Sequence, residues 1–269
     1  MSSPIEVADV APWVERLARV GYAAKGVLYI TVGLLAAQAG LGPGGETTDT
    51  HGALRVVLGL TFGHILLFVA AAGLMGYALW RLVEAVVDPD GRGTGLKGLA
   101  LRTGSAARGV FHGGLAIAAI RLASGSRSGD GSDPRQWTAF TFGLPGGELL
   151  VLLAAAGITG YGGYQLFRAY TAKLGRQLDL SPLPARAAGL VVGVSRFGIA
   201  ARGIVFGLIG FFLLRAAVDH DAGEAGGLEK SLDTLAGIGR WPFVAVASGL
   251  VAYGLYELVN ARYRRIRVE

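Results

Sequence analysis

Residues 19–26 read Arg-Val-Gly-Tyr-Ala-Ala-Lys-Gly, and the same pattern returns twice further along the chain. It stands at 102–109 as Arg-Thr-Gly-Ser-Ala-Ala-Arg-Gly and at 196–203 as Arg-Phe-Gly-Ile-Ala-Ala-Arg-Gly. Each copy has arginine, glycine, two alanines, a basic residue and a second glycine at the same positions. A long motif that recurs at a nearly constant spacing indicates tandem repeats, so we predict three copies of one unit.

A second block follows each copy of the motif, at Gly73–Tyr77, Gly157–Tyr161 and Gly249–Tyr253. Residues 26–45, 56–80 and 149–167 contain no acid, lysine or arginine. About 20 apolar residues cross a bilayer core, and these runs lack the alternation of barrel strands, which leaves the helix. We therefore predict an all-α integral membrane bundle of six transmembrane helices, built as three tandem helix hairpins.

The three units are predicted at residues 14–90, 97–175 and 190–265. Their helices are predicted near 20–41, 60–87, 104–123, 148–170, 196–218 and 241–261. The third and fifth helices are weaker alone, because 12 residues separate Arg108 from Arg121 and 12 separate Arg202 from Arg215. Both align with the strong first segment, and long arginines can extend towards each interface, so both are predicted to span.

The triplicate pattern R-x-G-x-A-A-[K/R]-G, followed by G-x-x-[G/A]-Y, resembles a bacterial membrane-protein family catalogued as domain of unknown function 1206. The resemblance covers the chain from about Val14 to Arg264. It implies three two-helix units in a bacterial plasma membrane. It implies no particular activity.

The composition and the absence of known motifs exclude several classes of function. The chain is 16% charged and contains no cysteine, which excludes disulfides, thiolate metal sites and cysteine nucleophiles. Its four histidines show no metal-ligand spacing, and no phosphate-binding loop or nucleophile elbow occurs. We predict no catalytic residue, no cofactor, no metal, no nucleic-acid partner and no enzymatic activity.

Lysine and arginine are distributed unequally between the predicted loops. The segments before the first helix, between the units and after the last helix hold thirteen of them, against five in the loops within the units. Positively charged loops favour the cytoplasmic side. We therefore predict a multi-pass protein of the cell membrane with cytoplasmic N- and C-termini.

Lys25, Arg108 and Arg202 occupy one position in the three first helices. We predict that position about two turns inside the cytoplasmic end, where long basic side chains can extend separately to lipid headgroups. Alternatively, a pseudo-threefold bundle brings the three together around an anionic group, most simply a lipid phosphate. Glu257 is predicted at matching depth as a counter-charge that neutralises one of the cations.

Other equivalent positions have diverged between the units. Arg81, Gln165 and Glu257 form a second triplet, in which Arg81 is also spaced to pair with Glu84 on its own helix. Gln38, Arg121 and Arg215 form a third triplet near the outer ends, predicted as interfacial anchors. The block tyrosines and the following aromatic residues are predicted to form an interfacial belt or to pack between helices, with a cavity lining as the alternative.

Small residues at one-turn or two-turn spacing predict close helix contacts. They include G-x-x-x-G pairs, a seven-residue glycine series and the glycines that open each second block. These positions are Gly109 and Gly113, Gly203 and Gly207, Gly26, Gly33 and Gly40, Gly73 and Gly76, and Gly157 and Gly160.

These patterns do not determine the function. Three classes stay open, of which a membrane-embedded enzyme is the least favoured because no catalytic motif occurs. The first is a non-enzymatic protein that organises membrane lipids, including anionic lipids, or protein partners. The second is a small transporter or channel, favoured by repeats and charges inside the membrane and weakened by the lack of proline-broken helices. A polar cavity at mid-membrane would favour transport.

Overall fold

The computed structural model describes residues 12–41, 63–88, 93–125, 134–171 and 178–264. Six long helices carry the fold: α1 (Pro12–Leu41), α3 (Gly63–Val87), α4 (Leu96–Ala123), α6 (Gly147–Thr171), α7 (Ala185–Val218) and α9 (Arg240–Tyr263). The short helices α5 (Pro134–Phe142) and α8 (Leu228–Ile238), with the 3-10 helix η2 (Ala222–Glu224), lie in the connections after α4 and α7. The described residues contain no strand, which confirms the all-α prediction.

Five of the long helices are long and apolar enough to cross a membrane, namely α1, α3, α6, α7 and α9. The remaining one, α4, falls short because Arg108, His112 and several glycines lower the hydropathy of its central part. The chain is therefore a multi-helix membrane protein. A sixth crossing by α4 stays a prediction.

The first helix of each unit begins earlier than predicted. The start of α1 is Pro12 instead of residue 20, that of α4 is Leu96 instead of 104, and that of α7 is Ala185 instead of 196. The apolar run marks the part of a helix that lipid can cover. In α1 and α4 the backbone hydrogen bonds continue through more polar residues before that run, because the helix does not depend on apolar side chains. In α7 the added residues 185–195 are themselves mostly apolar, with Arg186 as their one charged residue, and they lengthen the apolar helix.

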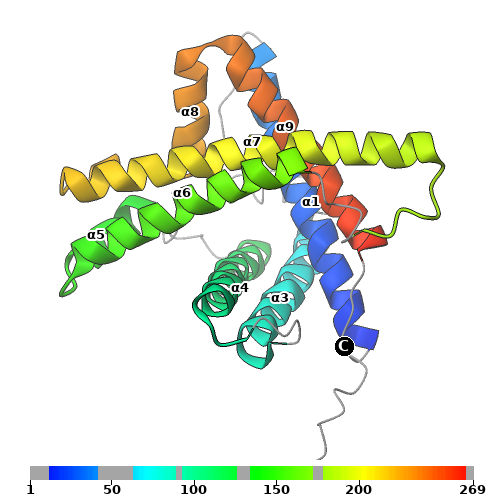
Figure 1. Cartoon of the computed structure of the whole chain (residues 1–269), viewed down its shortest axis with the longest axis horizontal. Coiled ribbons are helices and arrows are strands. Elements are labelled where there is room, and N and C mark those ends of the chain that lie inside the picture. The colour runs from blue at the N-terminus through cyan, green and yellow to red at the C-terminus, as the bar shows by residue number, and fades with distance from the viewer. Residues whose placement is uncertain (1–11, 42–62, 89–92, 126–133, 172–177, 265–269) are drawn as a thin grey trace, which may run out of the picture.

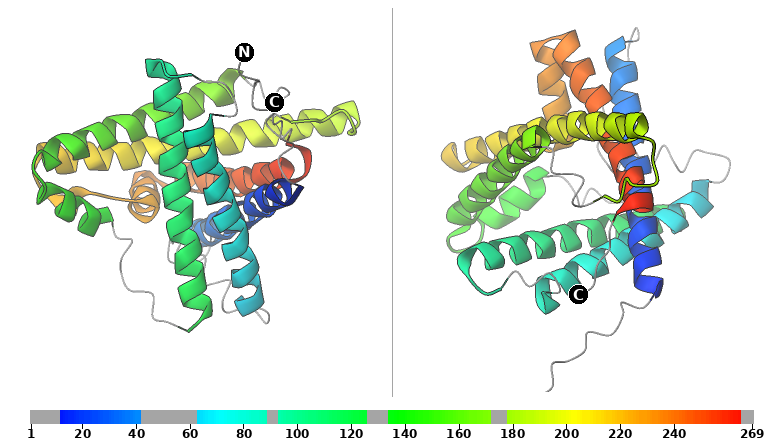
Figure 2. Two further views of the ribbon diagram at one scale, coloured as in Figure 1. Left: turned by 90° about the horizontal axis from the view of Figure 1, so that it is seen from below. Right: turned by 45° about the vertical axis from the view of Figure 1, so that its right-hand side comes forward.

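Each second helix packs along the first helix of the next unit. Thus α3 lies along α4, α6 along α7, and α9 along α1 (Figures 1 and 2). Within the units, α1 packs on α3 and α7 on α9, but α4 and α6 make no comparable contact. The six helices therefore form an arc, in the order α4, α3, α1, α9, α7, α6, that is open within the second unit.

The glycine that ends the repeat motif makes the same contact in all three inter-unit pairs. A Cβ at Gly26 would lie 2.9 Å from the carbonyl oxygen of Gly254. The same test gives 3.0 Å from Gly109 to the carbonyl of Ala78, and 3.0 Å from Gly203 to the carbonyl of Gly162. A side chain there would separate the helices, so the small residues set the distance between the backbones.

Most of the other predicted small-residue contacts are also present. Gly33 and Gly40 meet α9, and Gly73 meets Val20 of α1. The prediction is wrong for Gly157 and Gly160, because a Cβ at either would meet none of the described residues within 4 Å. Gly73 and Gly249, the counterparts of Gly157, face the first helix of their own unit, whereas the second unit does not bring its two helices into contact.

The main apolar core continues along α1 beyond Lys25. Val32 and Ala36 of α1, Leu74 of α3 and Leu250 of α9 are at most 1% exposed. This core packs the helices on one side of Lys25, and charged side chains gather at the level of Lys25 itself. The fold therefore surrounds a polar region with helices that are apolar on their outer faces.

Candidate functional site

Three aromatic pairs stand at equivalent places in the three inter-unit helix pairs. In each, the tyrosine of the second block packs edge-on against the residue four positions after the basic residue of the motif. The pairs are Tyr77 with His112 (ring centroids 4.7 Å apart), Tyr161 with Phe206 (5.1 Å) and Tyr253 with Tyr29 (4.7 Å). The block tyrosines thus pack between helices, and the prediction of an interfacial belt is wrong for these three.

Lys25 is buried beside these rings and is paired with an acid. Its Nζ donates to the Glu257 carboxylate at 2.6 Å and to the Tyr253 hydroxyl at 3.0 Å. The Tyr253 hydroxyl donates in turn to the same carboxylate. The lysine side chain is 8% exposed and the glutamate 3%. Glu257 therefore neutralises Lys25, and this pair joins the first unit to the third.

Arg202 is buried among aromatic side chains. It donates to the hydroxyls of Tyr29 (3.1 Å) and Tyr161 (3.0 Å). Its guanidinium also lies 4.5 Å from the ring centroid of Phe206 and 4.8 Å from that of Tyr253. Ring faces attract a cation, but they do not neutralise it. No acid pairs with Arg202 within the described residues.

Arg108 differs from its two counterparts because the tyrosine hydroxyl equivalent to theirs already accepts a hydrogen bond from another arginine. By analogy with Lys25 and Arg202, it should donate to Tyr77, but Arg81 Nε donates to that hydroxyl at 2.9 Å. Arg108 instead donates to the carbonyl of Gly104 (2.9 Å) and to Ser105 Oγ (3.3 Å), both on its own helix. It is half-buried, and it has no acidic partner in the described part of the chain.

Arg81 is itself neutralised on its own helix. Its guanidinium lies 2.6 Å from the Glu84 carboxylate, as the sequence spacing predicted. Ser105 of α4 donates to the same carboxylate at 3.3 Å. The charges of Arg81 and Glu84 therefore offset each other, at the interface where α4 packs on α3.

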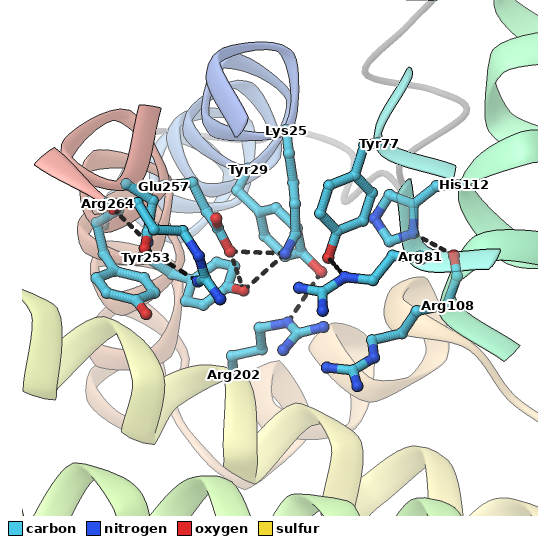
Figure 3. A network of polar contacts seen from close by, with 12 residues as sticks. Lys25, Tyr29, Tyr77, Arg81, Arg108, His112, Arg202, Tyr253, Glu257 and Arg264 are labelled. Atoms are coloured by element: carbon cyan, nitrogen blue, oxygen red, sulfur yellow. Dashed lines mark hydrogen bonds and ion pairs between the residues drawn. The ribbon is translucent and has the colours of Figure 1, made fainter. Parts of the chain in front are cut away.

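We call Lys25, Arg81, Glu84, Arg108, Arg202 and Glu257 the polar cluster. Figure 3 shows the ends of its four basic side chains directed towards one region between the helices. The cluster holds four cations and two carboxylates among the described residues. The two cations without an acid are Arg108 and Arg202, two of the three residues predicted to hold an anion.

Gln165 is the counterpart of Arg81 and Glu257 in the second unit. It is 1% exposed, and its Oε1 atom has no hydrogen-bond partner within the part of the chain described. A buried polar atom without a partner is costly and calls for a ligand or a water. The third triplet is different, since Gln38, Arg121 and Arg215 are exposed.

The three predicted cations lie deeper along their helices than the sequence indicated. Lys25, Arg108 and Arg202 come well over two turns after the starts of α1, α4 and α7, because these helices begin earlier than predicted. Lys25 and Arg202 are 7% and 6% exposed and bond to groups inside the protein. The prediction that these side chains extend separately to lipid headgroups is therefore wrong for Lys25 and Arg202.

The first arginine of the motif has a structural role that the sequence analysis missed. Arg19 donates to the carbonyls of Ala261 (2.8 Å) and Arg262 (2.9 Å) at the end of α9. Arg102 and Arg196 make the corresponding bonds to the ends of α3 and α6. A cation that caps the free carbonyls of a helix end is favourable. The presence of this arginine in all three copies of the motif was the sequence signal that could have predicted the role.

No group of three or more potential metal ligands occurs within the described residues. His112 packs on Tyr77, and its Nδ1 lies 2.8 Å from the Arg108 carbonyl oxygen. Its imidazole is thus committed to packing between α3 and α4 rather than gathered with other ligands.

Comparison with known proteins agrees with the repeat. The family model described as Domain of Unknown Function (DUF1206) matches three times, at residues 20–88, 103–172 and 197–264. Uncharacterized protein YxxB of Bacillus subtilis (strain 168) is 30% identical over 263 residues, which cover 97% of this chain and 95% of that protein. No solved structure matches significantly. Matches across nearly the whole chain confirm the resemblance, and the chain belongs to the family described as Domain of Unknown Function (DUF1206), whose unit it carries in three tandem copies.

Proposed function

We propose that this protein is a non-enzymatic membrane protein that binds an anionic group, most simply the phosphate of a membrane lipid, at Lys25, Arg108 and Arg202. The observation that carries the proposal is the excess of positive charge in the polar cluster. Arg108 and Arg202 have no acid among the described residues, while Glu257 neutralises Lys25. Uncompensated buried cations are costly, so a counter-ion from outside the chain would stabilise the folded protein.

The chemistry of the cluster favours phosphate over a carboxylate ligand. Arginine presents planar pairs of donors that match two oxygens of a phosphate. The tyrosine hydroxyls beside Arg202 already bond to its guanidinium, and they hold it in one orientation. A ligand would therefore meet donors that need little rearrangement.

We also propose that the protein lies in a bacterial plasma membrane with its N- and C-termini in the cytoplasm. The bonds of Arg19 to Ala261 and Arg262 support this, since they bring the start of α1 beside the end of α9. The distribution of lysine and arginine favours the cytoplasm for that side. A reporter fused after Glu269 that is active outside the cytoplasm and inactive within it would contradict the orientation.

Lipid retention tests the main proposal. The full chain and the triple variant Lys25→Gln, Arg108→Gln, Arg202→Gln are purified from the same cells, and the bound lipids are identified by mass spectrometry. We expect at least about a tenfold loss of anionic lipid in the triple variant, because charged hydrogen bonds are strong. The matched control removes the exposed Arg121 and Arg215, and it should retain lipid as the wild type does.

The single variant Arg108→Gln keeps the test valid if the triple variant does not fold. Arg108 bonds to its own helix and is half-buried, so its loss should leave the melting temperature nearly unchanged. Equal retention of anionic lipid by wild type, Arg108→Gln and a folded triple variant would refute the proposal.

Transport is the second candidate function. Its supporting observation is the burial of Lys25, Arg202 and Glu257 within helices apolar enough to span a membrane, since such charges often mark transport paths. Saturable phosphate uptake by vesicles containing the purified chain, lost in Lys25→Gln, would favour transport over lipid binding.

A further inference from the structure

The second unit lacks a contact that the other two units make. In the first unit, a Cβ at Gly21 would lie 2.6 Å from the carbonyl oxygen of Gly73, and in the third unit Gly249 lies against Ala201. The equivalent helices of the second unit, α4 and α6, do not pack on each other. In the part of the chain that the structure describes, a Cβ at Gly157 would meet nothing within 4 Å.

The missing contact leaves small and apolar side chains uncovered. Ala24 and Ala201 are buried in the first and third units, whereas Ala107, their counterpart, is exposed. Gly73 and Gly249 are buried in the same way, whereas Gly157 is exposed. We call Thr103, Gly104, Ala107, Gly157 and Tyr161 the open seam. In the other two units, the equivalents of Gly104, Ala107, Gly157 and Tyr161 are buried, whereas those of Thr103 stay exposed.

The open seam lies next to Arg108, one of the two cations of the polar cluster that lack an acid among the described residues. Arg108 follows Ala107 directly and bonds to the carbonyl of Gly104. Its side chain therefore runs back one turn along the seam, towards the N-terminal end of α4, where a lipid headgroup would be expected. On α6, Gln165 lies one turn after Tyr161 and is buried, and its Oε1 has no hydrogen-bond partner among the described residues. Charge and uncovered apolar surface thus occur together in one unit.

We propose that the open seam binds one anionic phospholipid, with its phosphate at Arg108 and an acyl chain along α4 and α6. This inference rests on the proposed function and adds where the lipid enters and which unit holds it. The charge of Arg108 complements a phosphate, and the uncovered small residues match an acyl chain. A free phosphate would satisfy Arg108 but would leave the seam uncovered, which is why the lipid is the better match.

The seam can be filled without disturbing the fold. Gly157→Leu places a side chain where no described residue lies within 4 Å of the Cβ, so the variant should fold as the wild type does. Ala107→Leu fills the seam from α4 instead. Gly163→Leu is the matched control, because Gly163 also has open space but points away from Gly157 on α6. Arg121→Gln is the control for Arg108→Gln on α4.

Binding is measured by native mass spectrometry of the full chain in detergent, with added phosphatidylglycerol, phosphatidylcholine or inorganic phosphate. We expect wild type to prefer phosphatidylglycerol. Arg108→Gln should weaken that binding by about tenfold or more. Gly157→Leu and Ala107→Leu should weaken phosphatidylglycerol binding by a similar factor and leave phosphate binding unchanged, while both controls bind as the wild type does.

The possible failures are distinguishable. If Arg108→Gln loses the lipid but both seam-filling variants bind normally, the seam is refuted and the proposed function stands. If wild type binds inorganic phosphate as strongly as phosphatidylglycerol, the ligand is a free anion and the lipid is refuted. If wild type binds neither anion above the phosphatidylcholine level, the proposed function fails as well. If the wild type is a dimer and Gly157→Leu is a monomer, the seam is an interface with a second copy of the chain, and the lipid site is refuted.

Discussion

The pair of Lys25 and Glu257 offers the sharpest test of how the polar cluster is held. We consider Glu257→Gln, which removes one charge and keeps the shape. At an effective dielectric constant of about 20, two charges 2.6 Å apart attract by about 6 kcal/mol. Removal of both from water opposes this attraction by several kcal/mol for each ion. The net contribution of the intact pair is therefore small, whereas a lone buried charge is strongly unfavourable.

Glu257→Gln should consequently destabilise the protein by about 3–5 kcal/mol, because Lys25 stays buried without its partner. For a chain of this size, that corresponds to a fall in melting temperature of roughly 6–20 °C. Addition of Lys25→Met to the same variant removes the unpaired charge, and it should restore most of the loss. The amide oxygen that replaces the carboxylate in that double variant can still accept the bond from Tyr253.

The assay is thermal unfolding of the purified chain in detergent, followed by the loss of helical circular dichroism. Asp219→Asn is the matched control, since its pair with Arg215 is about half exposed and should contribute about 0–1 kcal/mol. Two results would refute the reasoning. One is a fall for Glu257→Gln no larger than that of the control. The other is a further fall, instead of a recovery, in the double variant.

Two further predictions concern the contacts between helices. Arg19→Gln should lower stability by about 1–3 kcal/mol, because it removes two bonds to the end of α9, whereas the exposed Arg16→Gln should have almost no effect. The same melting measurement checks this, and equal effects of both variants would exclude the capping role. Gly198→Leu should prevent normal folding, because a Cβ there would overlap the backbone of Tyr253, while Gly193→Leu on the same helix has open space. The fraction of monodisperse protein after size-exclusion chromatography separates them, and a well-folded Gly198→Leu would contradict the packing.

The repeat carried most of what the sequence revealed about the fold. Three aligned copies allowed the weak segments around Arg108 and Arg202 to be recognised as helices. The series Gly26, Gly33 and Gly40 correctly predicted a packed face, because small residues one or two turns apart lie on one side of a helix. The starts of α1 and α4 were missed, since hydropathy reports the span that lipid covers and not the length of the helix. The start of α7 was missed although residues 185–195 are mostly apolar, because the prediction began at the repeat motif.

The repeat predicted which residues form the polar cluster better than it predicted their hydrogen-bond partners. The alignment placed Lys25, Arg108 and Arg202 at one register, and it named Glu257 and Arg81 as neighbours in depth. It did not reveal that Arg81 donates a hydrogen bond to the Tyr77 hydroxyl, which is therefore not bonded by Arg108. A register determines the position of a residue along a helix, but the partner of a side chain depends on which helix packs beside it.

The sequence by itself determined the class of this protein, its three units and the equivalence of their charged positions, because these properties depend on composition and spacing along the chain. Only the tertiary structure decided that second helices pair with the following unit, that α9 returns to α1, and that α4 and α6 stay apart. The reason is that each helix carries small residues suited to more than one neighbour. The choice among neighbours is made by close packing across the whole bundle, to which residues far apart in the sequence contribute together.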